Sequence, residues 1–256
     1  MPYEKVNGNG SPESSELAVA MVLDKSGSMG VLRDAVIEGF NDYLAELRTE
    51  PAETSFSLTL FDTRFSKVWV GEPLDRVPPL DELTYRPDGM TALYDAIAHT
   101  VIDTDRRLAG EGKEHVKTLV VVMTDGLENS STEYDAARLA RLVRSYEERP
   151  NWTFVYLGAA HDTLEEAQLE AARMGWKREN AMRWQADPAS AKASMDALAH
   201  ATKVRRASRQ LKSDAFFAEA HQLEDDYLGR AAPEPPPVKI VRQSLTEALF
   251  RGRRGR

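Results

Sequence analysis

The 256-residue sequence contains no cysteine. Disulfide bonds and thiolate metal sites are therefore excluded. The sequence also lacks a run of about 18 apolar residues, which is the length that a membrane-spanning helix needs. Residues 1–15 are polar and lack the apolar core of a signal peptide. We therefore expect a disordered leader at 1–15, no membrane association and a cytoplasmic protein.

Basic residues are in the minority, with 33 Lys and Arg against 41 Asp and Glu, and the net charge is −8. Six Lys or Arg and only two Asp or Glu lie in 231–256, so the acidic excess belongs to the rest of the chain. An acidic body disfavours binding to nucleic acid through its phosphates. The length suits one α/β domain with appendages. We expect this domain at 16–211, an extra helix at 212–230, and a Pro-rich linker with a basic tail at 231–256.

Short apolar runs alternate with helical patterns through most of the chain. The runs typical of strands lie at 17–23, 54–61, 65–70, 116–123, 152–157 and 180–184. The helical patterns lie at 31–47, 91–108, 134–148 and 164–174, and from 188 towards 211. The short turn between the second and third runs predicts a hairpin at a sheet edge. The alternation predicts an α/β fold, with a doubly wound, mostly parallel six-stranded sheet, one antiparallel edge strand and helices on both faces.

Polar side chains follow two of the predicted strands. Asp24, Ser26 and Ser28 come after the first strand, and Asp125 comes after the strand at 116–123. Thr91 precedes a predicted helix. These residues would supply two carboxylates and three hydroxyls, which suit a hard cation: Mg²⁺, with Mn²⁺ or Ca²⁺ as alternatives. Two carboxylates leave such a cation short of negative charge, so we expect an Asp or Glu from a partner protein to complete its shell.

Each of these segments also has a simpler interpretation when it is taken alone. The Asp24–Ser28 segment could be a Ser/Gly turn that caps the following helix, because Ser and Asp are favoured at helix N-caps. Thr91 could likewise be the N-cap of its own helix. Asp125 with Gly126 could be an ordinary turn. The metal interpretation depends on the three segments meeting in space.

Together the three segments resemble a known family. The stretch 24–28 (Asp-Lys-Ser-Gly-Ser) resembles the Asp-x-Ser-x-Ser signature of von Willebrand factor A (vWA) domains. The stretch 89–95 resembles the threonine segment of that family, and 124–126 resembles its second aspartate segment. The order and spacing are also similar, over about 15–210. The stretches 124–129 and 155–159 look like the compact stand-alone versions of the domain in bacteria.

The resemblance implies an intact metal-ion-dependent adhesion site (MIDAS) that captures an acidic side chain of a partner. In this family the two serines, here Ser26 and Ser28, usually bind the ion directly. The threonine, here Thr91, binds it directly or through water, and the aspartates, here Asp24 and Asp125, often act through water. We expect a surrounding rim that contacts the partner, consisting of Asp62, Asp88, Met90, Glu128, Asn129 and His161.

Two other functions are compatible with the same residues. A Mg²⁺-dependent hydrolase of phosphate esters could use an ion with an open coordination position. However, the sequence has no cysteine nucleophile, no Gly-x-Ser-x-Gly elbow and no Gly-x-x-x-x-Gly-Lys-Ser/Thr phosphate loop, so we expect no enzymatic activity. The second alternative is a metal-free scaffold. It is disfavoured because all five candidate ligands are present.

Overall fold

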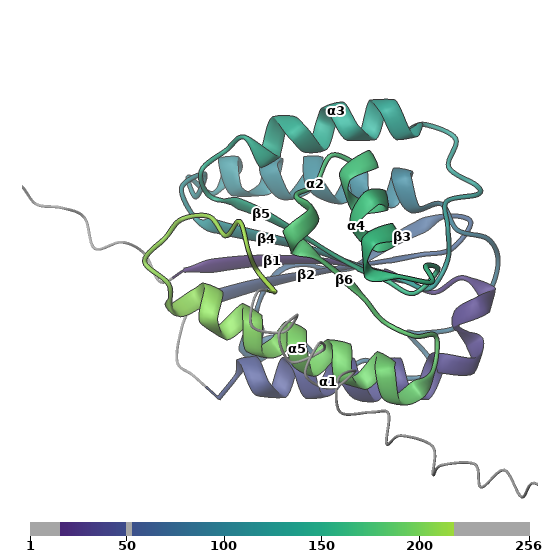
Figure 1. The fold of residues 1–256 in the computed structure, drawn as a ribbon. Helices are drawn as coiled ribbons and strands as arrows, with labels where there is room; N and C mark the ends of the chain where they lie inside the picture. Colours follow the sequence, from purple (N-terminus) through teal and green to yellow (C-terminus); the bar gives the residue numbers. More distant parts are fainter. Residues whose placement is uncertain (1–15, 50–52, 218–256) are drawn as a thin grey trace, which may run out of the picture. The chain divides into compact units, whose positions relative to one another are not determined.

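The computed structural model describes residues 16–49 and 53–217, which form a single β-sheet covered by helices on both faces (Figure 1). The strands are β1 (Leu17–Asp24), β2 (Thr54–Phe61), β3 (Phe65–Pro73), β4 (Lys117–Thr124), β5 (Trp152–Gly158) and β6 (Ala181–Arg183). The α-helices are α1 (Arg33–Leu47), α2 (Leu93–Gly110), α3 (Ala136–Glu147), α4 (Leu164–Arg173) and α5 (Pro188–Ala207). Short 3₁₀ helices are η1 (Gly27–Leu32), η2 (Leu74–Arg76) and η3 (Arg178–Asn180).

The strand order in the sheet is β3-β2-β1-β4-β5-β6. Only β3 runs antiparallel to its neighbour; the remaining pairs are parallel. This confirms the predicted doubly wound, mostly parallel sheet with an antiparallel edge strand. No residue of β3 is fully buried, which agrees with its edge position, since an edge strand packs against fewer neighbours.

The central strand β1 is buried along its whole length because both of its faces are covered. Val19 and Met21 face the core that β1 shares with α1 and α5. Ala20 and Val22 face the opposite core, which α2, α3 and α4 cover. Figure 1 shows these two helical layers on either side of the sheet. The continuous apolar run in the sequence therefore reflects two cores rather than one.

Some boundaries differ from the predicted ones. Helix α2 begins at Leu93 rather than at Thr91, and α5 ends at Ala207 rather than near 211. Residues 212–217 contain turns and no helix, and Phe216 and Phe217 are buried in the core on the α1 and α5 side. The described residues do not include the predicted leader 1–15, the rest of the predicted helix 212–230 or the tail 231–256. Among the described helices, none combines the length and apolar character needed to cross a bilayer.

The register of the sheet brings the candidate residues to one edge. Strands β1 and β4 are parallel neighbours, with Leu23 opposite Met123, so that both strands end at the same level. The loops that follow them, which begin after Asp24 and after Thr124, must therefore lie side by side. Ligand sites in doubly wound sheets lie at this carboxyl edge.

Candidate metal centre

The loops after β1 and β4 are joined by direct contacts between candidate ligands. The Ser28 hydroxyl donates a hydrogen bond to Asp125 Oδ1 at 2.7 Å. The hydroxyl oxygens of Ser26 and Ser28 lie 3.2 Å apart. Deeper in the site, the Thr124 hydroxyl donates to Asp24 Oδ2 at 2.5 Å. Four of the five candidate ligands thus belong to one connected cluster.

Thr91 joins this cluster next to Gly126. A Cβ atom added to Gly126 would lie 3.3 Å from Thr91 Oγ1 and 3.9 Å from Asp24 Oδ2. The missing side chain of Gly126 therefore leaves room for both oxygens. On the other side, the Gly27 N–H donates to the Gly89 carbonyl at 3.1 Å, which ties the loop after β1 to the Thr91 segment. All five oxygen-bearing residues meet at one place, as the metal interpretation requires.

The helix-capping alternatives do not hold. Ser26 precedes η1 but makes no side-chain capping bond, and α2 has Ala92 at its N-cap rather than Thr91. The Asp24 side chain instead accepts a hydrogen bond from the Ser26 N–H at 2.7 Å, which shapes the turn after β1. The serine and threonine hydroxyls are thereby left for the site itself.

The electrostatics of the cluster favour a bound cation. Asp24 is completely buried, and burial raises its pKa to about 6 although the Thr124 hydroxyl and the Ser26 N–H oppose the shift. The nearby negative charge of Asp125 adds to the increase, and burial also raises the pKa of Asp125. Within residues 16–49 and 53–217, no Lys or Arg forms an ion pair with either carboxylate. Lys25, the nearest basic residue in sequence, pairs with Asp62 instead.

The donor set fits a hard divalent ion. It offers two carboxylates without a basic partner and three hydroxyls, all of which are oxygen donors. In the part of the chain that the structure describes, no group of three or more His, Cys, Asp or Glu side chains is arranged to hold a metal. A metal in this cluster would therefore depend on the hydroxyls of Ser26, Ser28 and Thr91 as well as on the two carboxylates.

Asn129 holds the Thr91 backbone from the loop after β4. The Thr91 N–H donates to Asn129 Oδ1 at 2.8 Å, and the Asn129 N–H donates to the Thr91 carbonyl at 3.1 Å. Glu128 accepts hydrogen bonds from the Tyr94 N–H at 2.9 Å and from the Ser131 hydroxyl at 2.7 Å. The side-chain oxygens of these two rim candidates are already used within the protein.

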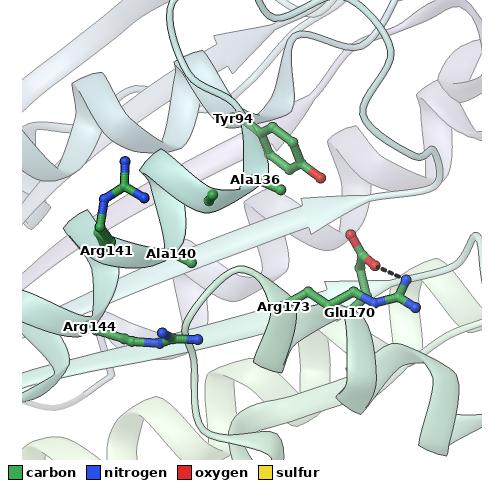
Figure 2. A pocket seen from close by; sticks show the side chains of 8 residues that line it. Tyr94, Ala136, Ala140, Arg141, Arg144, Glu170 and Arg173 are labelled. Atoms are coloured by element: carbon green, nitrogen blue, oxygen red, sulfur yellow. Dashed lines mark hydrogen bonds and ion pairs between the residues drawn. The ribbon is translucent and has the colours of Figure 1, made fainter.

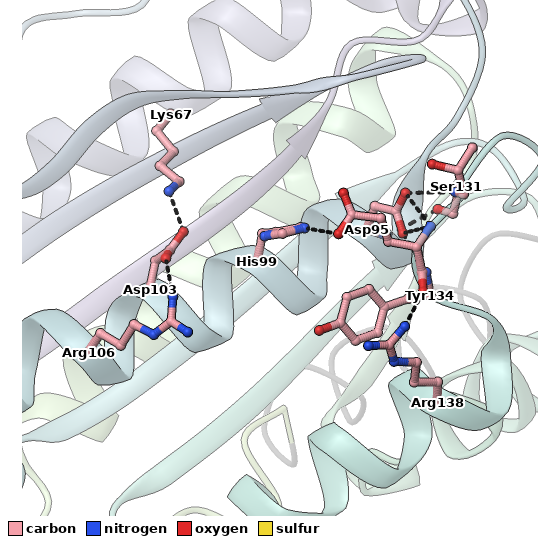
Figure 3. A network of polar contacts seen from close by, with 10 residues as sticks. Lys67, Asp95, His99, Asp103, Arg106, Ser131, Tyr134 and Arg138 are labelled. Carbon is pink, nitrogen blue, oxygen red and sulfur yellow. Dashed lines mark hydrogen bonds and ion pairs between the residues drawn. The ribbon is translucent and has the colours of Figure 1, made fainter.

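Asp95 fastens the same loop to the first turn of α2 (Figure 3). Its carboxylate accepts the N–H groups of Thr132 at 2.8 Å, Glu133 at 3.1 Å and Tyr134 at 2.8 Å. Asp95 is buried, whereas this part of the loop is largely exposed. The loop that carries Asp125 and the helix that follows Thr91 are consequently held together as one unit.

The remaining rim candidates lie in different settings. Asp62 pairs with Lys25 and accepts a hydrogen bond from the Arg64 N–H at 2.8 Å. Asp88 is exposed and accepts the N–H of the following glycine. Met90 is half exposed. His161 contacts the Tyr156 hydroxyl at 3.2 Å, and burial lowers the pKa of His161. Contact between these residues and a partner stays a prediction.

Two further supporting residues, like Asp95, were not predicted. Thr124 contacts Asp24 directly, and its place at the end of β4, next to Asp125, was the available signal. The buried Tyr85 hydroxyl donates to the Asp24 carbonyl at 2.6 Å. Tyr85 belongs to the Pro-rich loop 74–92, whose sequence has no periodicity that could place it there. Asn129, Asp95, Thr124 and Tyr85 thus support the five candidate ligands.

A cavity of about 590 Å³ lies elsewhere, between α3, α4 and the start of α2 (Figure 2). None of the five candidate ligands lines it. Its lining consists of Tyr94, Ala136, Ala137, Ala140, Arg141, Arg144, Glu170 and Arg173. It is therefore separate from the candidate metal centre.

No protein-family model matches the sequence, and no curated protein matches it. Proximal thread matrix protein 1 from the mussel byssus aligns with a TM-score of 0.50 and 16% identity, over 73% of this chain and 46% of that one. The same protein with a zinc-occupied MIDAS motif aligns with a TM-score of 0.49 and 17% identity, over 73% of this chain and 46% of that one. A von Willebrand factor type A structure from Catenulispora acidiphila aligns with a TM-score of 0.45 and 19% identity, over 73% of this chain and 42% of that one. The chain spans less than half the length of these proteins, and the first likeness shows a shared fold.

Proposed function

We propose that this chain is a divalent-metal-dependent protein-binding module of the vWA type. In this proposal Asp24, Ser26, Ser28, Thr91 and Asp125 hold Mg²⁺, and an Asp or Glu of a partner protein completes the metal shell. We also propose a cytoplasmic location and a stand-alone bacterial form of the domain. The proposed module binds its partner without catalytic turnover.

The observation that carries the proposal is the meeting of five oxygen-bearing side chains from three separate segments. Residues 24–28, 91 and 125 are far apart in sequence, yet their oxygens surround Gly126 and the Ser28–Asp125 contact. Two neighbouring carboxylates without a basic partner, one of them fully buried, destabilise the folded protein unless a cation compensates them.

The burial of the ligands gives the site a closed side and an open side. Asp24, Ser26 and Thr91 are buried, with at most 4% exposure, whereas Ser28 is exposed and Asp125 is partly exposed. A bound Mg²⁺ would supply a positive charge and a coordination position that a carboxylate can fill. A partner could reach the ion from the side of Ser28 and Asp125, while Asp24 and Thr91 hold it from below.

The direct test is affinity capture from the native cell in Mg²⁺ and in EDTA, with captured proteins identified by mass spectrometry. The variants are Asp24→Asn, which removes one charge from the site, and Asp75→Asn, which removes one charge from an exposed position in η2. We expect partners with wild type and Asp75→Asn in Mg²⁺, and none with Asp24→Asn or in EDTA. Recovery of the same partners by Asp24→Asn would show that the metal site is not what binds them.

A further inference from the structure

Three large apolar side chains are exposed in or next to the segments that carry the candidate ligands. Val31 is 83% exposed, Met90 50% and Leu127 53%. Each belongs to a different one of the three ligand segments: Met90 precedes Thr91, Leu127 lies two residues after Asp125, and Val31 lies three residues after Ser28. We call Val31, Met90 and Leu127 the apolar collar.

Contacts between the segments bring together the backbone that carries the collar residues. The carbonyl of Gly89, which precedes Met90, accepts a hydrogen bond from the N–H of Gly27 in η1, the short helix that also carries Val31. Leu127 directly follows Gly126, which lies against Thr91. Single exposed apolar residues scattered over a surface need no explanation, but a group around a ligand site marks an interaction surface. Exposing three such side chains in water is unfavourable, and contact with a partner would relieve that cost.

Charge restricts the kind of partner that fits this surface. The one lysine of the ligand segments, Lys25, is already paired with Asp62. Asp88 stands exposed in the loop before Met90, and the whole protein carries a net charge of −8. A partner segment with several acidic residues would be repelled by these charges. A single carboxylate can still reach the metal if its neighbours are uncharged.

We infer that the partner presents one Asp or Glu flanked by apolar side chains, which pack against the apolar collar. The inference rests on the proposed function, because the carboxylate is taken to complete the metal shell. The apolar flanks then supply the discrimination that one metal–carboxylate contact cannot provide, since any exposed acid could make that contact. An acidic segment without apolar flanks would leave the collar exposed to water and bind weakly.

The test measures fluorescence anisotropy of three labelled cyclic peptides in saturating Mn²⁺. They present Leu-Glu-Leu, Gly-Glu-Gly or Leu-Gln-Leu on the same ring. For the wild type, we expect Leu-Glu-Leu to bind roughly tenfold or more tightly than Gly-Glu-Gly, because burial of the leucines removes apolar surface from water. Binding of both glutamate peptides should be abolished by EDTA, and Leu-Gln-Leu should not bind.

The matched variants separate the collar from the metal. In the triple variant Val31→Ser, Met90→Ser, Leu127→Ser, the two glutamate peptides should bind equally, while Mn²⁺ affinity measured by calorimetry stays unchanged. Val204→Ser, at a position on α5 that is 49% exposed, should behave like the wild type.

The possible failures are distinguishable. Equal binding of the two glutamate peptides by wild type overturns the collar inference and leaves metal-dependent carboxylate capture standing. A preference for leucine that survives in the triple variant also overturns it. Binding of Leu-Gln-Leu as tight as that of Leu-Glu-Leu, or binding of neither glutamate peptide by the Mn²⁺-loaded protein, overturns the inference and the proposed function together.

Discussion

The Asp24→Asn substitution should stabilise the metal-free protein while it removes metal binding. Burial raises the pKa of Asp24 from 3.8 to about 6, so ionisation of this carboxyl in the folded state is unfavourable. The shift corresponds to about 3 kcal/mol at neutral pH, at 1.36 kcal/mol per pKa unit. Asparagine has the same shape and no charge. Its amide can donate to Thr124 Oγ1, and the threonine proton can turn to the Gly126 carbonyl 3.1 Å away.

The sign of the pH dependence follows from the raised pKa. The folded protein holds the Asp24 proton more tightly than the unfolded chain does, so protonation stabilises the fold. This stabilisation is complete below about pH 4 and is lost as the pH rises through about 6. Urea unfolding in EDTA should therefore show Asp24→Asn more stable than wild type by about 3 kcal/mol at neutral pH, with the difference vanishing in acid.

In excess Mg²⁺ at neutral pH, wild type should instead be more stable than Asp24→Asn. Only wild type has the charge to bind the ion, and binding stabilises the folded state. Asp75→Asn serves as the control and should match wild type in every condition. If Asp24→Asn is less stable than wild type in EDTA at neutral pH, the negative charge of the buried carboxylate does not destabilise the folded protein. The argument that the site calls for a cation would then be refuted.

Three further predictions concern the same centre. Mn²⁺ affinity, measured by calorimetry, should fall as the pH is lowered through about 6, because protonation of Asp24 competes with the ion. Asp95→Ala should cost about 2 to 3 kcal/mol in urea unfolding, because three loop N–H groups lose their acceptor and only partly regain water; unchanged stability would show that the loop does not need this anchor. Gly126→Ala places a methyl group 3.3 Å from Thr91 Oγ1 and should weaken Mn²⁺ binding by about tenfold or more with little loss of stability; unaltered affinity would show that Thr91 is not a ligand.

The sheet was predictable from sequence because its strands are short apolar runs separated by helical patterns. Strand β2 has the predicted bounds, β1 ends one residue later than predicted, and both ends of β4 lie one residue later than predicted. The helix starts were less predictable. Thr91 and Ala92 continue the apolar pattern of α2 in sequence, but hydrogen bonds to Asn129 and Asp62 hold their backbone in the loop.

Asp24, Ser26, Ser28 and Asp125 could be predicted because they lie at or directly after the ends of buried strands, where few other roles explain an aspartate. The residues that support these ligands could not be predicted from the sequence. Tyr85 reaches Asp24 across 61 residues of sequence, and Asn129 reaches Thr91 across 38. Such contacts depend on how long loops fold over the sheet edge, and local pattern carries no information about that. For the same reason the sequence does not reveal that the Glu128 oxygens bind backbone N–H groups within the protein.

The central claim is that the cluster of Asp24, Ser26, Ser28, Thr91 and Asp125 binds one divalent cation. Calorimetric titration of the purified protein with Mn²⁺ at neutral pH tests it most directly. We predict one ion per chain for wild type and Asp75→Asn, and no measurable binding for Asp24→Asn or Asp125→Asn. Binding of equal strength and stoichiometry in all four proteins, or in none of them, would contradict the account.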